Sequence, residues 1–209
     1  MEQLQEELGS ERFAYVDFHI RGSLGSDVGD EREAYYRVRG TPTVLFDGKN
    51  RRVGGSNHAS IYQTSLDNTE PESKINVEAT ASLDLATGLI SVDVRVEIGE
   101  TIDFPDECVV HAVLAEDLTA PRLEKKVARV RALTAPLEVD EEGETRSFSV
   151  LVDPADHWQT QNMHVIAWVQ RDSESAERDS KILNAVQTAF GQATPIEQTS
   201  WGQLKATFR

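Results

Sequence analysis

The chain has 209 residues, 39% hydrophobic and 27% charged, which is the balance of an ordinary globular protein with one or two domains. Its net charge of −15 repels phosphate backbones and anionic headgroups, so nucleic acid and lipid surfaces are poor partners. No apolar run approaches the roughly 18 residues of a membrane span. The single cysteine, Cys108, excludes an internal disulfide, a CxxC pair and a multi-cysteine metal site within this chain.

The N-terminal segment mixes helical and strand patterns. Residues 2–8 carry leucines four positions apart, which predicts the last turns of a helix. Residues 13–20, FAYVDFHI, are aromatic and β-branched and predict an internal strand. A short helix is expected over 30–37, where acidic residues in the first turn suit the helix dipole. No signal peptide is visible, which indicates the cytoplasm if Met1 is the true start.

Residues 40–55, GTPTVLFDGKNRRVGG, predict a hairpin. Residues 43–46 form an apolar strand, Asp47-Gly48 is a strong turn signal, and 51–53 can return as the antiparallel partner.

A further helix is predicted to be capped near residue 57 and to run to about Asn68. After it, the apolar residues recur at every second position. The polar run 69–74 marks a domain boundary. Residues 75–85 and 90–98 alternate apolar and polar side chains, which predicts a long antiparallel hairpin with one solvent-facing side. Further strands are expected at 107–115, 127–133, 145–152, 163–170 and 182–188. Seven short strands with turn-rich joints favour a β-sandwich.

The C-terminal tail, SWGQLKATF, is predicted to be a short amphipathic helix. Trp201, Leu204 and Phe208 are at helical spacing behind Ser200, which can cap a helix. These three apolar residues are the best candidates for contact with a protein partner, and packing back on the sandwich is the alternative.

The first 70 residues resemble the second half of a thioredoxin fold: strand, short helix, Gly-Thr-Pro-Thr, apolar strand, Asp-Gly hairpin, strand, Gly-Gly, helix. The resemblance implies that Pro42, preceded by Thr41, follows a cis peptide bond at the active-site end of the fold. Asp17 and His19 share one face of their strand and could line a cleft near Pro42, a structural role being the alternative. Thr41, Pro42, His19 and Asp17 are called the candidate cleft residues below.

The second half also has a likeness. HAVLAEDL, KVARVRAL, HWQTQN, VIAWVQ and KILNAVQ resemble the β-sandwich that follows a thioredoxin-like domain in a family of bacterial outer-membrane and secreted proteins. The two likenesses cover about residues 10–190. They imply an architecture and a location in the cell envelope or outside the cell rather than an activity.

The departure from thioredoxin lies at the start of the fold. A thioredoxin begins with a strand, the CxxC and half a helix, whereas this chain starts inside that helix. The missing strand normally lies between the strands at 13–20 and 43–46, where each unpaired backbone group would cost about 1–3 kcal/mol. The missing segment could precede Met1, a neighbouring chain could supply a strand, or the two edges could close directly.

No catalytic or metal site is predicted. Cys108 lies on an alternating pattern and is expected to be a buried structural thiol. The histidines lack ligand spacing, although folding could bring His111 and His164 together on adjacent strands. The acidic run 138–144 fits a solvated turn better than a calcium loop. Nothing implies an organic cofactor.

The sequence thus predicts an α+β protein with an N-terminally incomplete thioredoxin-like domain (1–70), a β-sandwich of about seven strands (75–190), and a linker with a short helical tail (191–209). The expected function is a non-catalytic binding or structural module of an envelope-associated or secreted bacterial protein. The alternatives are a C-terminal fragment of a thiol–disulfide oxidoreductase and a strand-complemented homodimer. The expected partner is a protein, a peptide, or a second copy that pairs with open sheet edges.

Overall fold

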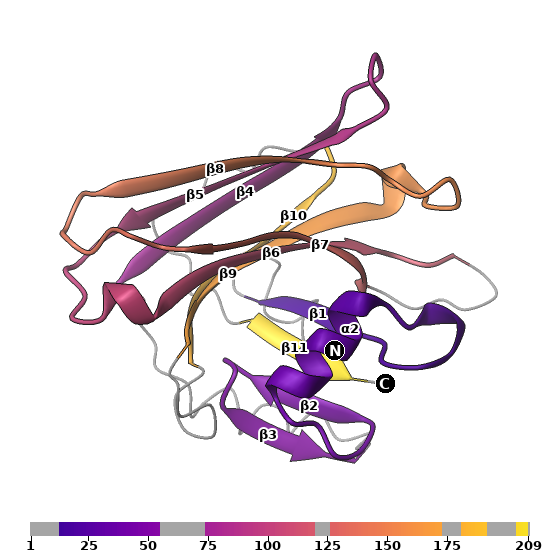
Figure 1. The fold of residues 1–209 in the computed structure, drawn as a ribbon, viewed down its shortest axis with the longest axis horizontal. Helices are drawn as coiled ribbons and strands as arrows, with labels where there is room; N and C mark the ends of the chain where they lie inside the picture. Colours follow the sequence, from indigo (N-terminus) through magenta and orange to yellow (C-terminus); the bar gives the residue numbers. More distant parts are fainter. Residues whose placement is uncertain (1–12, 55–73, 120–125, 173–180, 192–203, 209) are drawn as a thin grey trace.

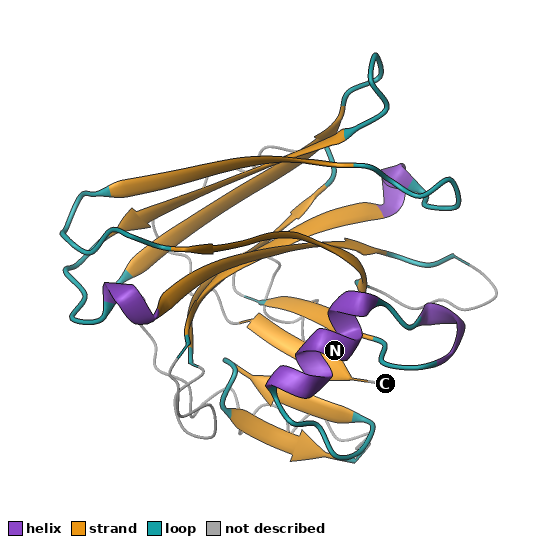
Figure 2. Ribbon diagram, in the orientation of Figure 1, coloured by secondary structure: helices purple, strands orange, loops and turns teal. Residues whose placement is uncertain are grey.

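The structure is a computed structural model. It describes residues 13–54, 74–119, 126–172, 181–191 and 204–208. Strands dominate these ranges, with a single α-helix among them (Figure 2). The helices predicted at 2–8 and near 57–68 lie outside the described residues. No helix of the described ranges is long and apolar enough to cross a membrane.

The N-terminal elements lie together at the bottom of Figure 1. They are β1 (Ala14–Phe18), the 3-10 helix Gly22–Leu24, α2 (Asp27–Tyr35), β2 (Thr43–Phe46) and β3 (Asn50–Val53). Strand β1 is buried along its whole length, as predicted for an internal strand. Helix α2 begins three residues before the expected position because Ser26 caps it, accepting a hydrogen bond from the Gly29 N–H (3.3 Å). The predicted hairpin is present, and β2 pairs antiparallel with β3.

The C-terminal tail corrects the sequence prediction at two points. Residues Leu204–Phe208 form a strand, β11, and not the expected helix. This strand lies between β1 and β2, parallel to β1 and antiparallel to β2. The position of the strand that the sequence lacks upstream is therefore occupied by a later segment of the same chain, and the two edges do not close directly because β1 and β2 do not pair with each other. Trp201 lies outside the described residues.

The apolar residues of the tail fit the spacing of a helix and also that of a strand, which explains why a helix was wrongly predicted. Leu204 and Phe208 are four apart, as on a helix face, but Leu204, Ala206 and Phe208 also alternate with polar residues as in a strand. Without β11, the facing edges of β1 and β2 would leave backbone groups unpaired. An extended tail pairs with both edges, and each group that finds a partner avoids a desolvation cost of about 1–3 kcal/mol.

All seven strands predicted in the second half are present. They are β4 (Ile75–Leu83), β5 (Ile90–Ile98), β6 (Cys108–Glu116), β7 (Val127–Pro136), β8 (Thr145–Val152), β9 (Met163–Arg171) and β10 (Ile182–Ala189), with 3-10 turns at Pro105–Glu107 and Thr160–Asn162. Strands β4-β5-β8 form one sheet, and β10-β9-β6-β7 form one half of a larger sheet that continues into β1-β11-β2-β3. The link between the halves is a single parallel residue pair, Asp17 with Val127.

Two hydrophobic cores hold these layers together. The first lies between the β4-β5-β8 sheet and the β10-β9-β6-β7 strands, which face one another in Figure 1. The alternation in β4 and β5 fills it, since Val77, Val92 and Val96 are 0–1% exposed. The second core lies on the opposite face of β6 and β9 and joins residues of β1, α2 and β2 to Val113 and Trp168. The N-terminal elements are therefore packed against the second half through an apolar interface.

Candidate functional site

The strand register gathers the candidate cleft residues at one end of the sheet. Phe208 pairs with Phe18 on one side and with Thr43 on the other. His19 follows Phe18 and Pro42 precedes Thr43, so both lie just beyond the same row of the sheet. The Thr41–Pro42 peptide bond is cis.

The four residues differ in how accessible they are. Asp17 and His19 are 3% and 7% exposed, and the His19 Nε2 lies 3.7 Å from the Asp17 Oδ2. Thr41 is exposed and Pro42 half-buried. The sheet end therefore presents Thr41 to solvent, while the carboxylate and the imidazole lie inside.

Local packing fixes the backbone of His19. The Ser26 N–H donates to the His19 carbonyl (3.3 Å), and a Cβ at Gly29 would collide with that same oxygen. Only glycine at position 29 lets the first turn of α2 approach so closely. The start of α2 thus holds the end of β1 in place.

A buried charged cluster lies beside Asp17 and was not predicted from the sequence. The Lys126 carbonyl accepts a hydrogen bond from the Asp17 N–H (2.9 Å). The Lys126 Nζ donates to both carboxylate oxygens of Asp117 (3.0 and 3.1 Å) and lies 3.0 Å from the His164 Nε2. Burial raises the pKa of the Asp117 carboxyl, but hydrogen bonds from His164 and Lys126 outweigh it and hold that pKa well below its usual range.

This cluster, called the Lys126 clamp below, joins the residue before β7 to the residue after β6 and to β9. Lys126 has a left-handed backbone (φ 55°) and is 5% exposed, and its ammonium donates to both carboxylate oxygens of Asp117. A charged lysine that is paired with a carboxylate is a poor nucleophile or base. No spacing signal links Lys126 to Asp117 and His164, because only the pairing of β6, β7 and β9 brings them together.

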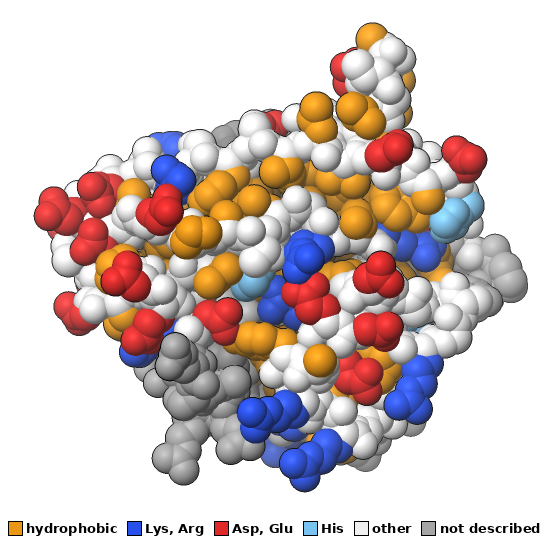
Figure 3. Space-filling view, viewed as in Figure 1, with side chains coloured by type: hydrophobic (Ala, Val, Ile, Leu, Met, Phe, Trp, Pro, Cys, Tyr) orange, Lys and Arg blue, Asp and Glu red, His pale blue; other side chains and the backbone are white. Residues whose placement is uncertain are grey.

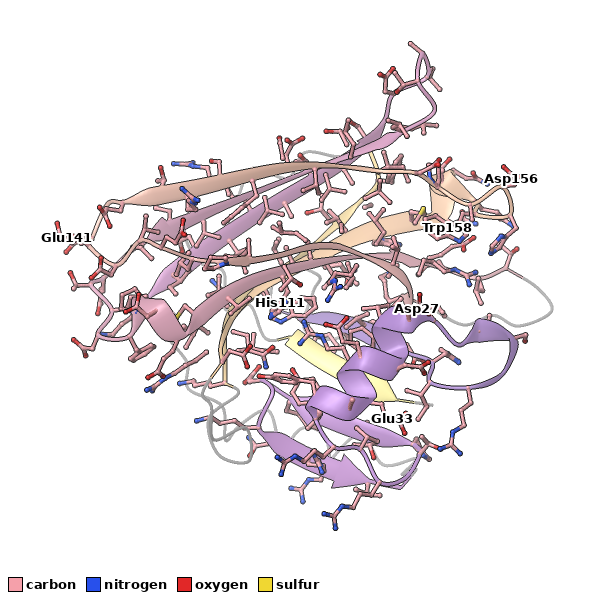
Figure 4. The ribbon with its side chains drawn as sticks, viewed as in Figure 1. Asp27, Glu33, His111, Glu141, Asp156 and Trp158 are labelled. Atoms are coloured by element: carbon pink, nitrogen blue, oxygen red, sulfur yellow. The ribbon has the colours of Figure 1, made fainter. Side chains whose placement is uncertain are left out.

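A second polar group lies under α2 (Figure 4). Arg32 is 4% exposed and its Nη2 donates to the Nδ1 of His111 (2.8 Å), while its Nη1 donates to the Gln170 Oε1 (3.3 Å). The guanidinium also lies over the Trp168 ring at 5.0 Å. The Gln170 Nε2 donates in turn to the Tyr36 hydroxyl (2.8 Å). These contacts join α2 to β6 and β9.

Arg32 imposes a protonation state on His111. Because the Nδ1 accepts from a guanidinium, it carries no proton itself. Burial, and after it the charges of Arg32 and Arg131, lower the pKa of His111 well below its usual value of 6.5. His111 is therefore neutral at physiological pH.

The remaining predictions concern Cys108 and metal binding. Cys108 is buried, its Sγ contacts the Phe104 carbonyl (3.4 Å), and burial raises its pKa to about 12. The prediction of a buried thiol is confirmed. His111 and His164 are on adjacent strands but four positions apart in register, since His111 faces Trp168. Within the described ranges, no group of His, Cys, Asp and Glu is arranged to hold a metal ion.

Comparison with known proteins shows a likeness of fold. No protein-family model and no curated protein sequence matches the chain. HBP35 of Porphyromonas gingivalis is 17% identical over 82% of this chain and 61% of the HBP35 chain, with a TM-score of 0.55. This chain thus spans less than two thirds of that relative.

Two further structures have lower scores. A domain of the outer membrane lipoprotein Omp28 from Porphyromonas gingivalis is 20% identical over 60% of this chain and 95% of that domain, with a TM-score of 0.38. Beta-glucosidase 3B from Thermotoga neapolitana is 13% identical over 59% of this chain and 17% of that enzyme, with a TM-score of 0.32. Of these three structures, HBP35 is the one whose TM-score supports a shared fold.

Proposed function

We propose that this chain is a non-catalytic, peptide-binding module of an envelope-associated or secreted protein. In this proposal a thioredoxin-like unit, residues 1–70 completed by β11, is supported by a β-sandwich over 75–190. The strand order β1-β11-β2-β3, with β11 parallel to β1 and antiparallel to β2, supports the thioredoxin-like assignment. The cis bond before Pro42 supports it too.

One observation carries the proposal: the sheet end that holds the candidate cleft residues presents the exposed residue Thr41 and has no thiol. Cys108 belongs to the other core and has a raised pKa. Pairing of β2 begins at Thr43, so the backbone N–H and C=O of Thr41 lie beyond the ladder. An extended peptide can pair with such groups, because main-chain hydrogen bonds supply affinity in strand addition.

The oxidoreductase alternative has a structural requirement. An additional strand bearing a CxxC at its end would need the position between β1 and β2, which β11 occupies with paired residues on both sides. It would therefore have to displace β11.

Selection from a random heptapeptide display library tests the binding function. We expect enriched peptides to bind the full chain and to bind a Thr41→Arg variant about tenfold more weakly, because an arginine there obstructs the backbone of an exposed position. The matched control is Leu85→Arg, at a hairpin tip where the side chain is 89% exposed.

Two results would contradict the proposal. One is equal binding by the Thr41→Arg and Leu85→Arg variants. The other is reduction of insulin disulfides by the chain, which would demand a thiol more reactive than Cys108.

A further inference from the structure

Strand β8 is a sheet edge with an open side. In the order β4-β5-β8 it pairs with β5 and has no second neighbour among the described residues. The Ile98 N–H donates to the Glu144 carbonyl (2.9 Å), which is the first rung of this ladder. Since hydrogen-bonded pairs alternate, the N–H and C=O groups of Ser147, Ser149 and Leu151 point to the open side.

The sequence of β8 does not protect this edge. From Ser147 to Val152 the strand reads SFSVLV, with no charge and no proline. The opposite edge of the molecule, β3, carries Arg51 and Arg52, a charged pattern that discourages pairing. Strand β8 lacks this protection over Ser147 to Val152 and can accept another strand.

Apolar side chains continue from β8 toward β7. Phe148 and Val150 of β8, and Val130 and Ala135 of β7, are half-buried at the margin of the first core. Leu151 is 67% exposed. Hydrophobic atoms form a band along this side of the molecule (Figure 3). A strand added to β8 would cover part of this band with every second side chain.

Acidic residues bracket the strand at both ends, and Figure 4 shows Glu141 and Asp156 at opposite ends of β8. The turn before β8 contains Glu138, Asp140, Glu141, Glu142 and Glu144, and Asp153 and Asp156 follow it. Two backbone N–H groups donate to the Glu144 carboxylate, which lowers its pKa and keeps it charged. The basic residue between Glu138 and Asp156 is Arg146, which pairs with Glu138.

This charge pattern selects the occupant. A second copy paired antiparallel through β8 would place the acidic turn of one chain against Asp153 and Asp156 of the other, and like charges disfavour that arrangement. We propose that β8 binds an extended segment of a protein partner that alternates apolar and polar residues and carries Lys or Arg at both ends. This site is separate from Thr41 and does not depend on the function proposed for it.

Two synthetic peptides test the proposal with the full chain. The first is Lys-Lys-Val-Thr-Val-Thr-Val-Lys-Lys, and the second has Glu in place of every Lys. We expect the lysine peptide to bind by fluorescence anisotropy, and to bind more weakly as salt is raised. Ser149→Pro, which removes an N–H on the open side without touching the β5 ladder, should weaken binding at least about tenfold.

The matched control is Ser149→Ala, which loses the same hydroxyl contact to Asp93 but keeps the N–H, and should bind within about twofold of the parent chain. A second variant, Glu142→Lys in the exposed turn, should weaken the lysine peptide and strengthen the glutamate peptide. It keeps the test valid if Ser149→Pro does not fold, which circular dichroism would show.

Several results would overturn the proposal. They are no binding of the lysine peptide, equal binding of the two peptides, and equal binding by the Ser149→Pro and Ser149→Ala variants. A dimer in sedimentation equilibrium that Ser149→Pro abolishes would also overturn it, because the occupant would then be a second copy.

Discussion

At the scale of single residues, the contact between Arg32 and His111 links charge to packing. The described contacts of Arg32 are with His111, Gln170, Tyr35 and Trp168, and none of these is a carboxylate. A proton on His111 would set two cations 2.8 Å apart in a buried site. The interface between α2 and the second half is therefore compatible only with the neutral imidazole.

This contact predicts a loss of stability in acid. The unfolded state binds a proton at His111 below about pH 6.5, whereas the folded state does not until much lower pH. The free energy of unfolding should therefore fall by up to about 1.4 kcal/mol per pH unit below pH 6.5 from this residue alone. Urea titrations of His111→Gln should give a flatter pH profile than the parent chain.

The control for this prediction is His157→Gln, which replaces an exposed histidine. Its profile should run parallel to that of the parent chain. Identical slopes for His111→Gln and the parent chain would show that His111 is not the group responsible.

The clamp of Lys126 and Asp117 predicts a second residue-scale effect. Lys126→Met leaves the Asp117 carboxylate without its main cation. We expect the free energy of unfolding to fall by about 2–4 kcal/mol. This is less than the full cost of breaking a buried pair, because the Asp117 side chain is 21% exposed. Lys74→Met is the matched control, since its pair with Glu100 is exposed and should contribute less than about 1 kcal/mol. If Lys126→Met and Lys74→Met lowered the free energy of unfolding equally in thermal unfolding, the Lys126–Asp117 pair would not be a buried clamp.

At the scale of elements, strands with their own alternating pattern could be predicted and β11 could not. In β4 and β5 every second residue is apolar over nine residues, so the period decides the structure without reference to the rest of the chain. The five residues of β11 fit two periods, and its neighbours β1 and β2 decide between them. Residues distant in sequence likewise form the Lys126 and Arg32 clusters, which local patterns cannot show.

The position of β11 predicts an unequal response to proline. Ala206 pairs with Val16 on one side and Leu45 on the other, so Ala206→Pro should lower the free energy of unfolding by about 3 kcal/mol or more through lost pairing on a central strand. Val53→Pro, at the end of edge strand β3 and 68% exposed, should cost less than about 1 kcal/mol. Similar midpoints for the two variants in urea would argue against a central β11.

At the scale of the whole molecule, the two predicted parts share structure in two ways. Strand β11 comes from beyond the second part in sequence but completes the sheet of the first. The second core joins Phe18 and Val28 of the first part to Val113 and Trp168 of the second. We therefore expect the parts to unfold in one transition, because removing either exposes the same apolar interface.

Amide hydrogen exchange of the full chain over residues 204–208 shows whether β11 fills the centre of the sheet, because a strand paired on both sides exchanges only through large-scale opening. We expect these amides to exchange as slowly as those of β1 and β2, and more slowly than those of edge strand β3. Exchange of residues 204–208 at the rate of an unstructured peptide, with β1 and β2 still protected, would contradict this expectation and leave the centre of the sheet without its strand.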